Sequence, residues 1–147
     1  MVGRLETPTS YKETGAIACL ALGMYCPNLR IGGTAHINPP YVPVLDFWLS
    51  QIPFAVRQSS IVVVTGVAFP LDGNDEINRR SERCQVLARY HIRESLIRNG
   101  IRPPNIINEF SPPNTITSLS LHPRSAYAEI RRINPFRHSD EIQPVYF

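Results

Sequence analysis

The stretch Ile61–Gly66, with the sequence IVVVTG, determines what kind of fold this chain can adopt. It begins with four consecutive β-branched residues, which favour the extended conformation over the helix. Because neighbouring residues of a strand point to opposite faces, an unbroken apolar run predicts a strand that is buried on both faces. We therefore expect residues 61–64 to lie in a central strand of a sheet.

Two helices are predicted, one on each side of this strand in the sequence. The first, over residues 44–52, places four apolar side chains on one face: Leu45, Trp48, Leu49 and Ile52. Trp48 is expected to lie in the core. The second helix runs from about Glu76 to Asn99, and Gly100 follows as a helix stop. Its inward stripe is predicted to consist of small and apolar groups: Cys84, Leu87, Ala88, His91 and Ser95.

Further strands are predicted before and after these helices. Residues 29–37 and 105–110 read as strands, and residues 125–133 alternate between apolar and polar side chains. Residues 15–25 read as a buried strand or a short helix. The pattern of residues 115–121 is ambiguous.

The predicted order is strand, helix, strand, helix, strand, strand, with one possible extra element at the N-terminus. Such alternation predicts an α/β sandwich, in which a mixed sheet carries two helices on one face. We expect residues 29–133 to form the domain. Residues 1–28 are expected to be a lead-in or an extra strand, and residues 134–147 a C-terminal tail.

Composition restricts the classes of protein to consider. The chain has 147 residues, of which 43% are hydrophobic and 18% charged. This suffices for one domain with a substantial core and excludes a disordered chain. No apolar run approaches the ~20 residues of a membrane-spanning helix, so no span is expected. The net charge is +3, and acidic residues are interspersed among the arginines, so we expect no nucleic-acid partner.

Motifs for catalysis and metal binding are missing from the sequence. It contains no P-loop, no GxGxxG, no GxSxG and no cysteine–histidine set with zinc spacing. We therefore expect a protein that is not an enzyme and that holds neither a metal nor a cofactor. Cys19 and Cys26 are expected either to close a small disulfide loop or, with Cys84, to be buried as small apolar side chains. His91 is expected to be buried and hydrogen-bonded.

Several segments, taken in order, resemble the OmpA-like domain, a peptidoglycan-associating module of bacterial envelope proteins. They extend from about residue 36 to residue 133, which is two thirds of the chain. The matching segments are LDFWL (45–49), IVVVTG (61–66), NRRSERC (78–84), LIRNGI (96–101) and SAYAEI (125–130). The resemblance implies a β-α-β-α-β-β fold. It also implies binding of diaminopimelate in a peptidoglycan stem peptide by an aspartate and an arginine.

The resemblance implies three ligand-binding residues in this chain. Arg83 would form a forked contact with the carboxylate of diaminopimelate, and Asp72 would accept its ammonium group. Asn78 would fix the binding loop by hydrogen bonds. The sequence departs from the family where Phe69 occupies the place of the usual aspartate, so that Asp72 needs a lengthened loop. Arg80 is a displaced candidate for the arginine.

The implied function is a non-catalytic module of the periplasm, outer membrane or cell wall that tethers an envelope complex to peptidoglycan. The alternative is a degenerate OmpA-like domain that has lost this binding. It would then be a structural protein–protein component of an envelope-spanning secretion or conjugation apparatus, as a homo- or hetero-oligomer. A small α/β enzyme or a nucleic-acid binder is the third alternative. No signal sequence is visible in residues 1–12.

Overall fold

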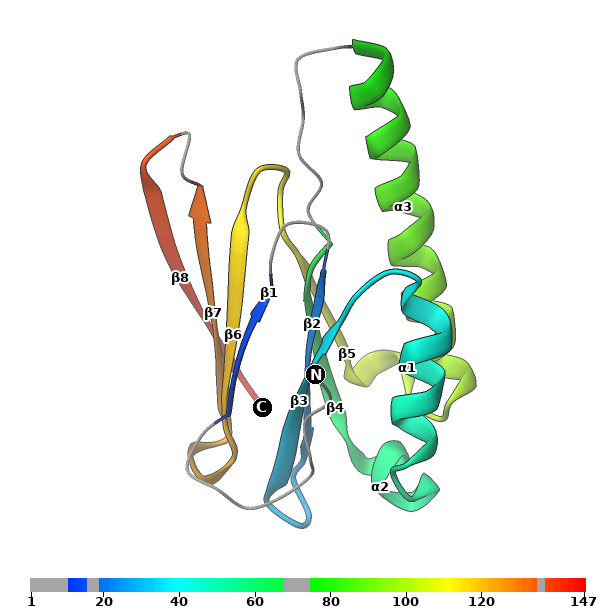
Figure 1. Cartoon of the computed structure of the whole chain (residues 1–147). Helices are drawn as coiled ribbons and strands as arrows, with labels where there is room; N and C mark the ends of the chain where they lie inside the picture. The colour runs from blue at the N-terminus through cyan, green and yellow to red at the C-terminus, as the bar shows by residue number, and fades with distance from the viewer. Residues whose placement is uncertain (1–10, 16–18, 68–74, 135–136) are drawn as a thin grey trace.

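The structure of the chain, a computed structural model, consists of three layers: two sheets and one layer of helices (Figure 1). It describes residues 11–15, 19–67, 75–134 and 137–147. Within these ranges, the side chains of three segments are not described, namely those of residues 11–15, 75–78 and 80–82.

The first sheet forms the middle layer and is mixed. Its strands, in spatial order, are β3 (Ile31–Ile37), β2 (Leu20–Cys26), β4 (Ile61–Gly66) and β5 (Ile106–Phe110). Strand β2 is antiparallel to both of its neighbours, whereas β4 and β5 are parallel. A parallel pair needs a crossover connection, which here is the helix α3 (Asp75–Arg98). The prediction that residues 61–64 lie in a central strand is confirmed.

The second sheet is antiparallel throughout. Its strands, in spatial order, are β1 (Tyr11–Gly15), β6 (Ile116–His122), β7 (Tyr127–Asn134) and β8 (Ser139–Tyr146). The sequence predicts one sheet, whereas the last strands of the expected domain lie in this second one. Strand β8 occupies most of residues 134–147, which were expected to be a tail. Its sequence signal is weak because only Val145 among its residues is buried.

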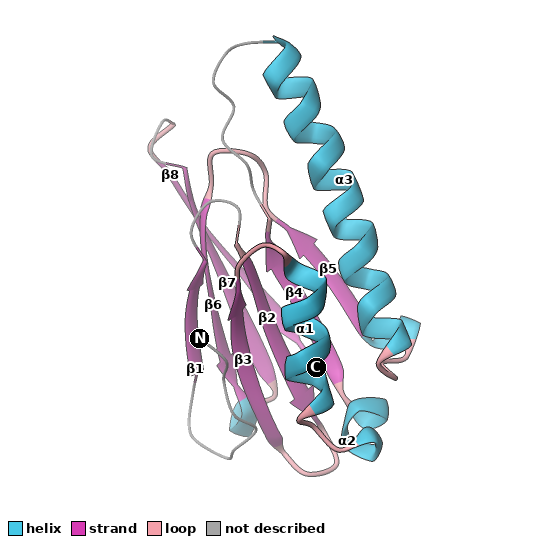
Figure 2. Ribbon diagram, turned by 45° about the vertical axis from the view of Figure 1, so that its right-hand side comes forward, coloured by secondary structure: helices cyan, strands magenta, loops and turns pink. Residues whose placement is uncertain are grey.

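The helices cover one face of the first sheet (Figure 2). They are α1 (Tyr41–Ser50), α2 (Phe54–Ser59) and α3, and short 3-10 turns occupy Pro103–Asn105 and Pro123–Ser125. All four residues of the apolar face predicted for residues 44–52 are buried, Trp48 among them. The α/β sandwich with a mixed sheet and helices on one face is therefore confirmed. None of the helices in the described ranges is long and apolar enough to cross a membrane.

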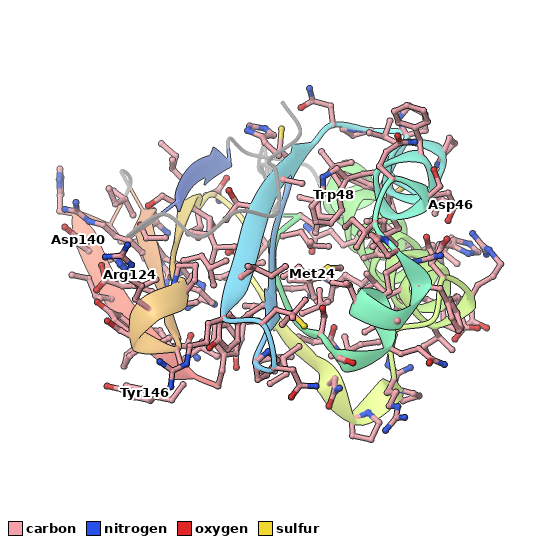
Figure 3. All side chains as sticks on the ribbon, turned by 90° about the horizontal axis from the view of Figure 1, so that it is seen from below. Met24, Asp46, Trp48, Arg124, Asp140 and Tyr146 are labelled. Atoms are coloured by element: carbon pink, nitrogen blue, oxygen red, sulfur yellow. The ribbon has the colours of Figure 1, made fainter. Side chains whose placement is uncertain are left out.

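The central strands contribute to two separate apolar cores. Val62 and Val64 of β4 point toward the helices, whereas Val63 points toward the second sheet. Strand β2 alternates in the same way, and Met24 lies with Trp48 in the core on the helix side (Figure 3). Burial of both faces explains why four β-branched residues can stand side by side in this strand.

The sheets approach closely at the glycine pair of β3. A Cβ atom on Gly32 would lie 2.7 Å from Cδ2 of Leu121 in β6 and 2.8 Å from the carbonyl oxygen of Met24. Only glycine fits such a spacing without displacing its neighbours.

The inward face of α3 differs from the prediction. Cys84 and His91 are exposed, and Leu87 is 57% exposed, so the prediction that these residues are buried is wrong. The buried residues of the described part are Gln85, Ile92, Ser95 and Leu96. The inward face is the one on which Ile92 and Leu96, in the C-terminal half of the helix, pack against the first sheet. The N-terminal half extends beyond the strands of the first sheet (Figure 1), and Val86 and Leu87 in its described part are exposed.

The disulfide alternative is also wrong. Cys19 directly precedes β2 and Cys26 ends it, so the two are about 23 Å apart at ~3.3 Å per residue, and neither forms a disulfide. Cys26 is buried and Cys19 is partly buried.

The C-terminal half of α3 is held against α1 by Asp46. Ser95 Oγ and Asn99 Nδ2 each donate a hydrogen bond of 2.7 Å to its Oδ1, and Arg98 Nη2 donates to both carboxylate oxygens at 2.8 and 2.7 Å. Burial by itself raises the pKa of Asp46. The hydrogen bonds from these three side chains and the charge of Arg98 outweigh burial and lower the pKa below its ordinary value of 3.8.

The C-terminal end of β8 is docked onto the core between the sheets. The ring of Phe147 stacks on Tyr25 of β2 with centroids 5.0 Å apart, and its backbone N–H donates to the carbonyl of Ala126 at 3.0 Å. A residue beyond the last strand thus joins the second sheet to the first.

Replacing Phe147 tests this docking. We expect Phe147→Ala to lower the free energy of unfolding by about 1–2 kcal/mol, because the stacked pair and its apolar contacts are lost. Chemical denaturation measures the change. Ile142→Ala, on a β8 side chain that is 58% exposed, is the control and should cost less than about 0.5 kcal/mol. Equal effects of the two substitutions would show that residue 147 does not dock.

The hydrogen bonds of Asp46 predict a dependence of stability on pH. Because the pKa of Asp46 is lower in the folded state, the unfolded chain binds the proton more readily, and stability is lost as the pH falls through and below the ordinary value. Asp46→Asn removes this contribution. Between about pH 5 and pH 2 its free energy of unfolding should therefore decline less steeply than that of the wild type. Denaturation across this range tests the expectation, with the exposed Glu94→Gln as control. An unchanged slope for Asp46→Asn would contradict it.

Candidate functional site

The space between the two sheets becomes polar at one end. Along the inward face of β7, the buried residues Ala128 and Ile130 are followed by Arg132, which is only 8% exposed. On β8, Glu141 is paired with Arg132, and Ser139 is paired with Asn134. The β7–β8 hairpin, the connection from β5 to β6 and the N-terminal half of α3 all lie at this end of the molecule (Figure 1).

Arg132 is held by three neutral acceptors. Its Nη1 donates to Oε1 of Gln143 at 2.7 Å, its Nη2 to the carbonyl oxygen of Glu109 at 2.9 Å, and its Nε to Oγ of Ser111 at 3.4 Å. The nearest carboxylate oxygen, Oε2 of Glu109, is 3.9 Å from Nη2. The guanidinium is therefore positioned by neutral groups, and its ion pair with Glu109 is at the outer limit of such contacts.

Three buried hydroxyl groups from both sheets lie next to this arginine. The hydroxyl of Ser111 lies 2.6 Å from that of Thr117 in β6 and 3.3 Å from that of Thr65 in β4. All three side chains are buried. The chain of hydroxyls connects both sheets beneath Arg132 and satisfies polar groups that would otherwise be costly to bury.

A second arginine reaches the same place from α3. Nη2 of Arg89 donates to the carbonyl oxygen of Ser111 at 2.9 Å, and its guanidinium lies 4.9 Å from the ring centroid of Phe110. Burial lowers the pKa of Arg89. Its Nε is buried without a hydrogen-bond partner among the described residues. Two partly desolvated cations thus flank Ser111, just after the carboxyl end of β5.

A pocket of about 310 Å³ opens beside Arg132. Its lining comes from the β5–β6 connection and from the β7–β8 hairpin, and its polar residues are Asn114, Thr115, Arg132, Asn134, Arg137, Ser139 and Glu141. We call it the Arg132 pocket. Within the described part of the chain, no group of three histidine, cysteine or acidic side chains is placed to hold a metal ion.

The binding residues implied by the sequence lie elsewhere. Asp72 and Phe69 are outside the described residues. Asn78 lies in the first turns of α3, and the side chains of both Asn78 and Arg80 are outside the description. Arg83 is exposed on α3. No described contact brings the three implied binding residues together.

Arg83 belongs to an exposed stripe on the overhanging half of α3. Arg79, Arg83, Val86 and Leu87 line a surface cavity of about 510 Å³, and Tyr90 continues the stripe at helical spacing. Val86, Leu87 and Tyr90 are 66%, 57% and 58% exposed. We call these five residues the α3 stripe.

Sequence reasoning missed the Arg132 pocket, although one signal for it was present. The predicted strand over residues 125–133 has Ala126, Ala128 and Ile130 on its apolar side, and the next position on that side is Arg132. A charged side chain at an inward-facing position of a strand indicates either a binding site or a sheet edge that is protected against pairing with another chain. Which of the two applies depends on the β8 side chains opposite it.

Comparisons with known proteins do not assign a family. No protein-family model matches the chain, and no curated protein matches it. Among solved structures, it is similar to one described as the Bacillus licheniformis hypothetical protein YfiH, with 12% identity and a TM-score of 0.43. The match covers 68% of this chain but only 46% of that protein, so it spans less than half of the neighbour's length. With so low a TM-score, this similarity carries no argument about function.

Proposed function

We propose that this protein is a non-catalytic binding module of the cell envelope, which tethers an envelope complex to peptidoglycan through Arg83. The supporting observation is the exposure of Arg83 on the part of α3 that extends beyond the strands. There its guanidinium, with that of Arg79, lines a surface cavity. A guanidinium in such a place is open to a forked contact with a carboxylate.

The position of the cavity beside Arg83 agrees with the usual place of ligands in open α/β sheets. Ligands of such sheets bind beyond the carboxyl ends of parallel strands, and Gly66 and Phe110 end the parallel strands β4 and β5. The resembling segments lie in order on α1, β4, both ends of α3 and β7. The diaminopimelate carboxylate would contact Arg83, and Asp72 and Asn78 would complete the site. The periplasm, outer membrane or cell wall is the location that this function requires.

A specific observation favours a second function, that of a structural protein–protein component in an envelope apparatus. Three large apolar side chains of the α3 stripe are more than half exposed, and two arginines precede them on the same stripe. Arginine and aromatic residues are enriched at protein interfaces, and exposed apolar groups gain most when a partner covers them. The partner would be another envelope protein or a second copy of this chain.

Co-sedimentation with diaminopimelate-type sacculi at low salt tests the first function. The wild type should bind, and free diaminopimelate should compete. Arg83→Ala should bind at least about tenfold more weakly, because the carboxylate loses its charged partner. Arg102→Ala, an exposed arginine beyond the other end of α3, should bind as the wild type does. Failure of the wild type to co-sediment, or undiminished binding by Arg83→Ala, would contradict this function.

Site-specific photo-crosslinking tests the second function. A photo-reactive residue at Leu87 should give one discrete protein adduct in envelope preparations. The same residue at Ile142, which is equally exposed on β8, should give none. Because Leu87 and Ile142 are equally exposed, a difference in adduct formation shows that the partner prefers the α3 stripe, and accessibility does not explain it. Adducts of equal intensity at both positions, or at neither, would exclude the α3 stripe as a protein interface.

A further inference from the structure

Arg132 is the most buried arginine in the described part of the chain. The exposed Arg131 forms a two-point ion pair with Asp140, and the exposed Arg98 is paired with Asp46 at 2.7 Å. Arg132 is far less exposed than either, yet all its hydrogen-bond acceptors are neutral. Its nearest counter-ion, the carboxylate of Glu109, lies 3.9 Å from Nη2, and burying a charge with so distant a counter-ion is costly. The fold retains this cost at the wall of an open pocket.

The guanidinium also has donor capacity to spare. An arginine carries five N–H groups, and the described contacts of Arg132 use three of them. One N–H on each terminal nitrogen is left, and the side chain lines the Arg132 pocket. Arg137 contributes a second guanidinium to the same lining. A guanidinium with an N–H to spare on each terminal nitrogen can contact both oxygens of a carboxylate.

The pocket also contains an acidic group that is not neutralised. Glu141 lines the pocket and is paired with Arg132 in the β7–β8 register. The ion pairs between described residues are those of Asp46, Asp140 and Glu109, so Glu141 has no basic nitrogen of a described residue within 4.0 Å. A cationic and an anionic group therefore line one small cavity without forming an ion pair with each other.

From this arrangement we infer that the Arg132 pocket binds a small zwitterion, a free α-amino acid, with its carboxylate on Arg132 and its ammonium group on Glu141. A simple anion would satisfy Arg132 but would be repelled by Glu141. A simple cation would meet the reverse problem. Side-chain amides and hydroxyls of Asn114, Thr115 and Ser139 supply further donors and acceptors. The volume of about 310 Å³ is at the lower limit of ligand pockets, as a ligand of this size requires.

This inference is independent of the α3 stripe and of peptidoglycan. Its test uses ¹⁵N NMR of the full chain titrated with pools of the free amino acids in both enantiomers, and then with the single amino acid that binds. Acetate, ethylammonium and inorganic phosphate are the partial probes. We expect shifts of the backbone amides of Asn114, Thr115 and Ser139 with at least one amino acid. The partial probes should bind about tenfold or more weakly, since each makes only one of the charged contacts.

Glu141→Gln separates the two contacts without touching the packing, because Glu141 is exposed. It should weaken amino-acid binding about tenfold to hundredfold and leave acetate binding equal or stronger. Arg137→Ala should weaken binding of both amino acid and acetate. Glu94→Gln, on the exposed side of α3, should change neither. The inference is overturned if no amino acid shifts these amides, if acetate or phosphate binds as tightly as the best amino acid, or if Glu141→Gln binds it unchanged.

Discussion

The requirement that β2 and β4 bury both of their faces governs the rest of the structure. Val62 and Val64 need a layer of helices on one side, and Val63 needs a second sheet on the other. A two-layer protein would leave one of these faces in water, at a cost of roughly 25 cal/mol for each Å² of apolar surface. The parallel pairing of β4 with β5 then requires a long crossover, and α3 provides it.

The same constraint places the polar site. The apolar side chains of β7 and β8 fill the space between the sheets only part of the way, from Val145 to Ile130. Beyond them the inward positions carry hydroxyl, amide and guanidinium groups, and Ser111 connects these to the first sheet. Buried polar groups need partners, so this end is ordered by directional hydrogen bonds and not by close apolar packing. An ordered polar wall beside an open pocket is suited to recognising a small charged ligand.

The α3 stripe and the Arg132 pocket lie at the same end of the molecule but depend on different parts of the fold. The stripe is on a half-helix whose described side chains are mostly exposed, whereas the C-terminal half of α3 is held to α1 through Asp46. The pocket is built on paired strands. A macromolecular partner suits the first surface, because it can cover apolar residues that the protein leaves exposed. A small ligand suits the second.

The sequence alone determined the elements in which the spacing of apolar residues shows which face is buried. The run of β-branched residues specified the central strand, and Leu45, Trp48, Leu49 and Ile52 specified the inner face of α1, because each pattern fits only one secondary structure. It could not determine the inward face of α3, since Leu87 is apolar but lies where no layer covers the helix. Nor could it show that residues 139–146 form a strand, because partners on β7 hold that strand in place. The juxtaposition of Arg132 with Glu141 and Ser111 was decided by the tertiary structure alone. It arises because segments that are distant in sequence pair in the fold, and no local sequence pattern predicts that these three residues lie close together.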